Sequence, residues 1–546
     1  MRTILLFAFL ATEAVGAQAT TADITTADLK HRLTIIADDS MMGRESGSKG
    51  DYMAAAYIAS EFRRLGLEPA GEGGTYFQTV PFWRATVDSA SRLVVHGTVL
   101  RAGPDFIPAN LRAPGRTLDG VKVVYGGDAA DSARWIAPSA AAGDIVVLDV
   151  RGKGRLRGVG RLLSRWRPAV AVAVVALDQL GSEQIARFRE GVPITDTTRD
   201  TAAVPVLMVT QRAGALLLGA APSTLTPGAI GATVSGRFDF ARSPVPFAAR
   251  NVVAVLRGSD PRLRGEYVSL TAHNDHVGFD HSPVDHDSLR AFNRVVRPMG
   301  ADSPMRDPTP EEWTRIRAIL DSLRRVRPPR RDSIRNGADD DGSGTVAILE
   351  IAEKMARGSA RPKRSILFVS HTGEEAGLLG SRWFTDHPTV PLDSIVGEID
   401  EDMVGRGTAT DFPRGGTGAG DPTYLEVVGA KRLSHQFGDI LEAANARQPI
   451  PFVFDYEYDV PGHPLQYYCR ADHYSYARYG IPSVALSRGE HLDYHQVTDE
   501  AQYIDYTDLA RVTRMVYDAA LALADAPTRP ALDAPKQQDP HAPCVQ

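Results

Sequence analysis

RSILFVSH, residues 364–371, is a short apolar run bounded by polar residues, and the preceding stretch TVAILEIAEKMARG (345–358) has the periodicity of an amphipathic helix. The same alternation of strand-like and helix-like segments is seen in NVVAVLRG (251–258), YVSLTAH (267–273), SIVGEIDEDM (394–403), PSVALSRG (482–489) and YTDLARVTRMVYDAALAL (506–523). Strands that alternate with helices are typical of a mostly parallel sheet covered by helices on both faces. We therefore predict an α/β fold built on a mixed, mostly parallel sheet flanked by helices.

Acidic and imidazole side chains stand where these strands end or helices begin, at the sheet edge where open α/β folds bind ligands. They are His273, Asp340, Glu374, Glu375, Asp402 and His495. Two imidazoles with several carboxylates suit zinc or a similar divalent ion. The carboxylates outnumber the needs of one tetrahedral shell, which predicts two ions sharing a bridging carboxylate. Asp340 is the expected bridge, because the glycines of NGADDDGSG (336–344) let the backbone turn sharply around the middle aspartate.

Neighbouring residues have predicted roles in orientation and proton transfer. Asp275 is two residues beyond His273, so on extended backbone both side chains project to the same side. Asp275 can then accept a hydrogen bond from the second ring nitrogen of His273 and fix its tautomer. Glu374 and Glu375 are adjacent and cannot both reach one ion from extended backbone, so one is expected to bind metal while the other takes a proton from the attacking water.

Five motifs contain these residues: TAHNDHVG (271–278), NGADDDGSG (336–344), HTGEEAGLLGS (371–381), IDEDMVG (399–405) and DYHQVTDE (493–500). In this combination the chain resembles the di-zinc aminopeptidase family that includes bacterial leucyl aminopeptidase and aminopeptidase Y, in the clan of glutamate carboxypeptidase. The resemblance covers about residues 246–525 and implies the zinc exopeptidase fold.

The resemblance also implies a role for each matched residue. His273 and Asp402 would complete one zinc shell, Glu375 and His495 the other, and Asp340 would bridge two Zn²⁺ ions per chain. Glu374 falls on the family's general base and Asp275 on its ligand-orienting aspartate. His276, which belongs to the first motif, is expected to support the ligands rather than to bind metal.

The chain is long enough for several domains. We predict a signal peptide over 1–19, an N-terminal part of the peptidase domain over 20–115, and the peptidase domain itself over 241–526. Residues 116–240 resemble the β-rich protease-associated domain that such enzymes often insert. An insertion at 280–335, in which Thr309 and Pro310 begin a helix, is expected to form a wall or lid over the cleft. The Pro-rich stretch 527–546 predicts a disordered tail.

Composition restricts the setting and the partners of the protein. A formal net charge of -6 gives no basic field for nucleic acid. The apolar run near residues 4–11, followed by small residues, predicts export to the periplasm or beyond, and no later run is long enough for membrane insertion after signal removal. A bridge between Cys469 and Cys544, the two cysteines, is the less favoured expectation because Cys544 lies in the predicted disordered tail.

The predicted function is hydrolysis of peptide bonds, with removal of N-terminal residues from peptide substrates as the leading interpretation. Three alternatives remain: a carboxypeptidase or dipeptidase of the same clan, a glutaminyl cyclase, which uses a similar scaffold with one zinc, and a receptor-like binding protein that has lost catalysis. All predicted ligand positions carry suitable side chains, which disfavours the last. The sequence does not determine the oligomeric state.

Overall fold

The computed structural model describes residues 20–109, 113–129, 131–151, 164–181, 185–186, 190–195, 203–304, 306–359, 361–407 and 421–546. The predicted signal peptide at 1–19 lies outside these ranges.

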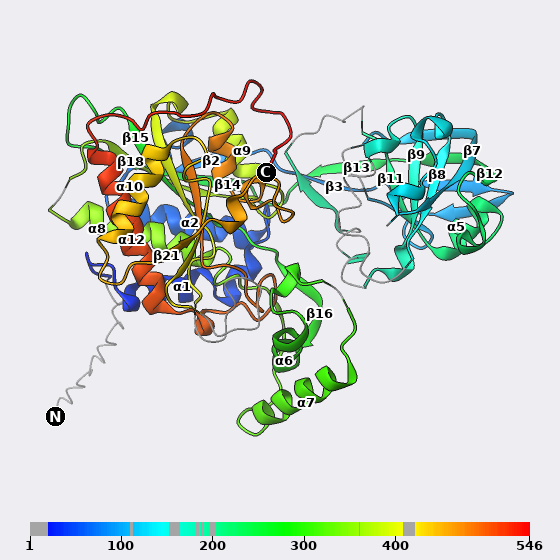
Figure 1. The fold of residues 1–546 in the computed structure, drawn as a ribbon, viewed down its shortest axis with the longest axis horizontal. Helices are drawn as coiled ribbons and strands as arrows, with labels where there is room; N and C mark the ends of the chain where they lie inside the picture. The colour runs from blue at the N-terminus through cyan, green and yellow to red at the C-terminus, as the bar shows by residue number, and fades with distance from the viewer. Residues whose placement is uncertain are drawn as a thin grey trace, which may run out of the picture.

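The larger body is built on a nine-stranded sheet in the order β1-β14-β18-β15-β19-β22-β20-β21, with β2 also pairing with β14 (Figure 1). Its strands are β1 (Glu68–Pro69), β2 (Phe77–Val80), β14 (Ala249–Leu256), β15 (Tyr267–His273), β18 (Ser365–His371), β19 (Ile395–Glu401), β20 (Tyr424–Val428), β21 (Val453–Asp455) and β22 (Ser483–Ser487). Strands β18, β15, β19 and β22 are successive parallel neighbours. Strand β14 runs antiparallel to β18, and β20 antiparallel to β22. The predicted mixed, mostly parallel α/β sheet is thus confirmed.

Helices cover both faces of this sheet because its strands send alternate apolar side chains to each face. In β14, Val252 and Ala254 belong to one buried cluster, and Val253 and Val255 to another. The first cluster includes side chains of α1 (Thr26–Ile36), α2 (Lys49–Arg64), α8 (Gly342–Arg357), α10 (His435–Ala446) and α12 (Tyr506–Asp525). The second includes side chains of α9 (Leu379–Asp386) and α11 (His473–Ala477).

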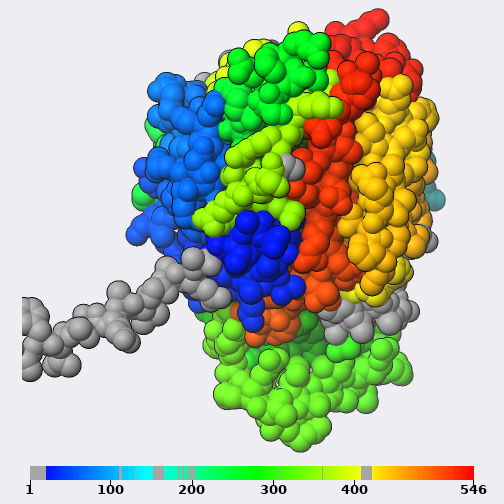
Figure 2. Space-filling view, turned by 90° about the vertical axis from the view of Figure 1, so that its left-hand side faces the viewer, coloured from blue at the N-terminus to red at the C-terminus, as the bar shows by residue number. Residues whose placement is uncertain are grey.

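Figure 2 shows α1, α8, α12 and α10, which are far apart in sequence, side by side on one face of the molecule. No helix within the described ranges has both the length and the apolarity needed to cross a membrane.

A second body stands to the right in Figure 1, joined to the first through β3 and β13. Its eight-stranded sheet has the order β5-β4-β12-β7-β8-β9-β11-β6, and a three-stranded sheet, β10-β3-β13, lies beside the connection. Their elements are β3 (Trp83–Val87), β4 (Arg92–Val95), β5 (Thr98–Arg101), β6 (Phe106–Pro108), β7 (Arg116–Asp128), β8 (Ile145–Asp149), β9 (Ala171–Val175), β10 (Val192–Ile194), β11 (Val206–Val209), α5 (Gln211–Leu218), β12 (Ile230–Phe238) and β13 (Phe240–Pro244).

The bounds of this second body differ from the predicted 116–240. Strands β4 and β5, well before residue 116, already belong to its sheet because β4 pairs with β12. Such a pairing joins segments about 140 residues apart in sequence, and local hydrophobic patterns carry no information on it.

The insertion at 280–335 folds as a small subdomain below the main body in Figure 1. Strands β16 (Phe279–Asp285) and β17 (Arg331–Ile334) pair, and helices α6 (His286–Val296) and α7 (Pro310–Arg324) connect them. As predicted, Thr309 caps α7 and Pro310 is its first residue. Helix α6 contacts the loop before α12, where the Asn293 side-chain amide donates to the Leu492 carbonyl at 2.9 Å.

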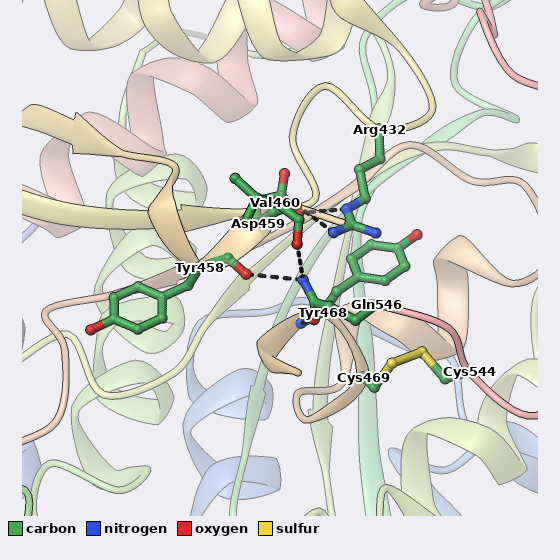
Figure 3. The surroundings of a disulfide bond; sticks show 8 residues. All are labelled: Arg432, Tyr458, Asp459, Val460, Tyr468, Cys469, Cys544 and Gln546. Atoms are coloured by element: carbon green, nitrogen blue, oxygen red, sulfur yellow. Dashed lines mark hydrogen bonds and ion pairs between the residues drawn. A yellow bond between two sulfur atoms is a disulfide. The ribbon is translucent and has the colours of Figure 1, made fainter. Parts of the chain in front are cut away.

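The stretch 527–546 is predicted to be a disordered tail, but in the structure it lies against the main body. Cys544 forms a disulfide with Cys469, which corrects the low weight that the sequence gives to this bridge (Figure 3). Gln546 donates to the Tyr458 carbonyl at 3.0 Å and accepts from the Tyr468 amide at 2.9 Å. The composition of this stretch shows only that it has few apolar residues. The residues that bind it in the structure, such as Tyr458 and Cys469, lie elsewhere in the chain.

Candidate metal centre

All six predicted site residues converge at the carboxyl edge of the central sheet. The strand ends of β15, β18 and β19 contribute His273, the pair Glu374 and Glu375, and Asp402, while the loops before α8 and α12 contribute Asp340 and His495. The ring of His273 lies 3.2 Å from Asp340 and 3.7 Å from Asp402, measured from Nε2 to the nearest carboxylate oxygen. The ring of His495 lies 3.0 Å from Asp340 and 2.9 Å from Glu375. Parallel strands bring their carboxyl ends to one edge, which explains the convergence.

These side chains form two groups that share Asp340. One contains His273, Asp340 and Asp402, and the other contains Asp340, Glu375, His495 and His276. Asp340 turns Oδ1 toward His273 and Oδ2 toward His495, so its two oxygens face different groups. This is the geometry that a bridging carboxylate requires.

The donor atoms of both groups fit a divalent cation. Among the described residues, several buried atoms lie close to one another without a hydrogen bond of good geometry: His273 Nε2, His276 Nδ1, Asp340 Oδ2, Glu375 Oε1 and Asp402 Oδ1. Buried polar atoms are almost always hydrogen-bonded, so a cluster of such atoms around common points calls for another partner. Imidazole nitrogens with carboxylate oxygens form a donor set that suits zinc.

His276 is the member of this cluster that sequence reasoning assigned only to a supporting role. Its Nδ1 lies 2.8 Å from Glu375 Oε1 and 3.7 Å from Asp340 Oδ2, and its ring meets that of His495 edge-on with the centroids 5.5 Å apart. A backbone bridge to Glu45 holds the chain here, beyond the end of β15. The sequence shows only that His276 lies three residues after His273. The direction of its ring depends on the contact with the remote segment at Glu45.

Asp275 orients its surroundings in a different way from that predicted. Nδ1 of His273 is 3.1 Å from the backbone carbonyl of Asp275 and 3.6 Å from its carboxylate. That carboxylate accepts hydrogen bonds from the Ser46 hydroxyl at 2.6 Å and from the Glu374 backbone amide at 3.1 Å. Asp275 therefore fixes the His273 ring mainly through its carbonyl and fixes the start of the Glu374 loop through its carboxylate.

The three consecutive aspartates divide their roles. Asp340 points into the site, as predicted, whereas its neighbours brace the backbone around it. Asp339 accepts from the Gly405 amide at 2.7 Å. Asp341 caps helix α8 and accepts from the His273 amide at 3.0 Å. The outer two carboxylates therefore tie the loop of Asp340 to the strands that carry His273 and Asp402.

The pKa values of the two adjacent glutamates are shifted in opposite directions. Burial, followed by the negative charges of Asp402 and Glu375, raises the pKa of Glu374 well above its usual value. Burial acts in the same direction on Glu375, but the imidazoles of His495 and His276 lower its pKa to about 2. Neighbouring carboxyl groups whose pKa values are pushed apart are typical of a division between proton transfer and charge stabilisation.

His495 is held in a conformation that is unusual for a side-chain-bearing residue. Its backbone has φ of +56°, in the left-handed region, which costs of order 1–3 kcal/mol for a residue with Cβ. The ring stacks on Tyr494 with the centroids 4.0 Å apart. Burial would lower the pKa of His495, but the carboxylates of Glu375 and Asp340 raise it to about 10. The surrounding contacts thus stabilise a strained residue at the centre of the site.

A cavity of about 350 Å³ opens from this cluster. Asp340, Glu374, Glu375, Asp402 and His495 line one part of it. The sequence also leaves open two arginines that could reach the cleft, Arg470 and Arg488. Arg488 is buried and bonded to Asp508 at 3.1 Å, away from the cavity lining. Arg470 does line the cavity and pairs with Asp302 at 2.8 Å.

Comparisons with known proteins agree with this geometry. Residues 251–520 match the family model described as Peptidase family M28. Leucine aminopeptidase 1 of Paracoccidioides brasiliensis (strain Pb18) is 32% identical over 201 residues, which cover 34% of this chain and 47% of that protein. A probable zinc metalloprotease of Pyricularia oryzae is 26% identical over 217 residues, covering 35% and 43%. The chain thus spans about half the length of the curated relatives it matches.

A solved structure, the aminopeptidase from Aneurinibacillus sp. strain AM-1, is similar to this one with a TM-score of 0.52. The alignment covers 94% of this chain and 96% of that one at 16% sequence identity. At this identity the likeness is one of fold, and it extends over both bodies of the chain.

Proposed function

Residues 251–520 match the model of peptidase family M28, and on this basis we propose that the protein is a zinc aminopeptidase that releases N-terminal residues from peptides. The observation that carries the proposal is the convergence of buried imidazole and carboxylate atoms in two groups that share Asp340 at the sheet edge, with Glu374 beside them. Hydrolysis needs a cation site, a group that moves a proton and a cleft for the substrate. All three occur together at this edge.

In this proposal two zinc ions bind per chain. His273 and Asp402 would hold one, Glu375 and His495 the other, and Asp340 would hold both. His276 adds a nitrogen donor on the side of Glu375 and His495. When bound, zinc supplies Lewis-acid chemistry that lowers the pKa of water and polarises a carbonyl.

Glu374 is proposed as the general base. Its carboxylate lines the cavity and lies 4.0 Å from the His273 ring without being part of either ligand group. It would accept a proton from the attacking water and return it to the leaving amine. Asp275 would set the position of this loop through the Glu374 amide.

A free α-amine is the proposed recognition element of the substrate. Several carboxyl groups line this part of the cavity, which favours an ammonium group. Two arginines line the cavity and could bind a C-terminal carboxylate, Arg382 and Arg470. Arg470 is already paired with Asp302, yet the presence of both keeps a carboxypeptidase as the second candidate.

Matched tripeptides with a free amine, an acetylated N-terminus and an amidated C-terminus separate the two. We expect the acetylated peptide to be cleaved at least about 10- to 100-fold more slowly than the free one, because a charge-assisted contact is lost, and the amidated peptide to be cleaved normally. Fast cleavage of the acetylated peptide, abolished by C-terminal amidation, would establish the carboxypeptidase instead. Elemental analysis should give two zinc ions per chain, whereas one ion at saturation favours the cyclase-type site.

We further propose that the second body is a protease-associated domain and that the chain acts after export, in the periplasm or outside the cell. The Cys469–Cys544 disulfide supports an oxidising compartment independently of the N-terminal sequence. Thiol labelling of protein isolated from its native host tests export, since labelled cysteines in the native protein would place it in a reducing compartment.

A further inference from the structure

The cavity extends from the metal cluster to a second group of acidic residues. Its distal lining includes Glu426 and Glu490, together with Tyr467 and Arg470. None of these four belongs to the ligand groups described above. The proposed hydrolysis therefore does not account for the distal acids.

Glu426 is a buried carboxylate with few hydrogen-bond donors or cations around it to stabilise its charge. It lies on β20 opposite Ser487 of β22, and only 2% of it is exposed. Within the described residues it accepts one hydrogen bond, from the Tyr424 hydroxyl at 3.5 Å, which is long. Burial of an ionised carboxylate without a close donor is costly. Consistently, burial, followed by the charges of Glu490 and Asp455, raises the pKa of Glu426 well above its usual value.

Glu490 is the second acid and is only partly neutralised. It accepts a hydrogen bond from the Tyr467 hydroxyl, and Arg470 lies 3.9 Å away. Arg470 is closer to Asp302, at 2.8 Å, and lies over the Tyr467 ring. Burial and the neighbouring Asp302 raise the pKa of Glu490 to about 7. One guanidinium thus serves Asp302 and Glu490, and Glu426 has no ion pair of its own among the described residues.

Apolar side chains also line this cavity: Leu378, Met403, Val428, Ala471, Ala485 and Leu486. Strand β20 is two strands away from β19, whose end carries Asp402, since β22 lies between them. At the usual strand spacing this separation is about 10 Å. Only a long side chain, apolar along its stem, can extend from a peptide bond held at the metal cluster to Glu426.

We propose that Glu426 and Glu490 form the floor of the pocket for the side chain of the substrate's N-terminal residue and select a cationic one, lysine or arginine. This inference rests on the proposed aminopeptidase function. A lysine or arginine stem packs along the apolar walls while its charged end meets the two carboxylates. A leucine side chain fills the walls but leaves Glu426 buried without an ion pair and Glu490 only partly neutralised, which penalises it.

The test is the ratio of kcat/KM for arginine and lysine substrates to that for leucine, methionine and glutamate substrates, with the same fluorogenic leaving group on the zinc-loaded full chain. We expect arginine and lysine to be preferred over leucine by about 10-fold or more. Glu426→Gln, which keeps shape but removes charge, should lower this ratio by about 10- to 100-fold with little change in the leucine rate. Glu490→Gln should lower it as well.

Asp439→Asn is the matched control, because Asp439 is an exposed carboxylate on α10 outside the cavity and its variant should keep the wild-type ratio. Zinc content and Tm are measured for every variant. Inhibition of the wild-type protein by arginine and leucine hydroxamates gives the preference without any substitution. A leucine preference in both measurements, or a ratio unchanged in Glu426→Gln with zinc retained, would overturn the pocket assignment while leaving the aminopeptidase intact. Failure to cleave any substrate of the panel would instead overturn the proposed function.

Discussion

Removal of the Cys469–Cys544 disulfide should destabilise the main body markedly without disturbing the metal cluster. The two cysteines are 75 residues apart in sequence. Constraint of a loop of this length in the unfolded chain corresponds to about 4.5 kcal/mol at 25 °C in the chain-entropy treatment. At roughly 2–4 °C per kcal/mol for a large domain, Tm should fall by roughly 9–18 °C in the Cys469→Ser/Cys544→Ser double variant.

The assay is differential scanning calorimetry of the zinc-loaded protein, with zinc content and peptide hydrolysis measured in parallel. We expect two zinc ions to be retained, because no proposed ligand lies in the tail. We also expect altered kinetics, because Cys469 lines the cavity beside Arg470. Wild-type protein treated with reductant is the control and should approach the variant's Tm. A Tm within about 2 °C of the wild-type value would refute this reasoning and show that the remaining tail contacts, such as that of Gln546 with Tyr458, suffice.

Three further predictions follow from the site and the core. Glu374→Gln should retain zinc but lose about 10²- to 10⁴-fold in kcat, measured with zinc quantified, and near-normal turnover would exclude it as the base. His276→Ala should weaken binding of one zinc ion by about 10- to 100-fold in chelator competition, and unchanged affinity would show that its ring is only a support. Glu353 of α8 belongs to a buried network with residues of α1 and α2. Burial raises the pKa of Glu353, but its contacts with Arg64, Thr20 and Arg32 outweigh burial and lower the pKa to about 2. A carboxyl group whose pKa is lowered by folding stabilises the protein at pH values above its unfolded-state pKa, and this contribution is lost as the pH falls toward 2. Glu353→Gln should therefore lower the free energy of unfolding in urea at pH 7. The decline of that free energy below about pH 4.5 should be shallower in the variant than in the wild type. An equally steep decline in the variant would place the acid sensitivity elsewhere.

The fold class and the ligand positions could be predicted from the sequence because both follow from short-range patterns. Apolar runs such as RSILFVSH identify buried strands wherever they pair, and a parallel sheet brings the residues after its strands to one edge. His273, Asp340 and Asp402 could therefore be placed together without knowledge of their distances. The geometry of each metal group could not be predicted in this way, because it depends on the side-chain conformations in the folded protein.

The position of the His276 ring could not be predicted from the local sequence. Its ring joins the Glu375 and His495 group because a remote backbone at Glu45 holds the turn after β15. The same holds for Cys544, whose stretch lacks the apolar residues of a core element and is ordered by a bond to residue 469.

The sequence by itself determined the alternation of strands and helices, the chemical types of the ligands and the acidic residue available as base. Each of these features depends on residues that are close together in sequence, so hydrophobic periodicity and side-chain type are enough to predict it. Only the tertiary structure decided that β4 belongs with β12, that Asp340 divides its two oxygens between two groups, and that Glu426 faces the same cavity as Glu374. These features depend on contacts between segments far apart in the chain, and such contacts are fixed only when the whole core packs.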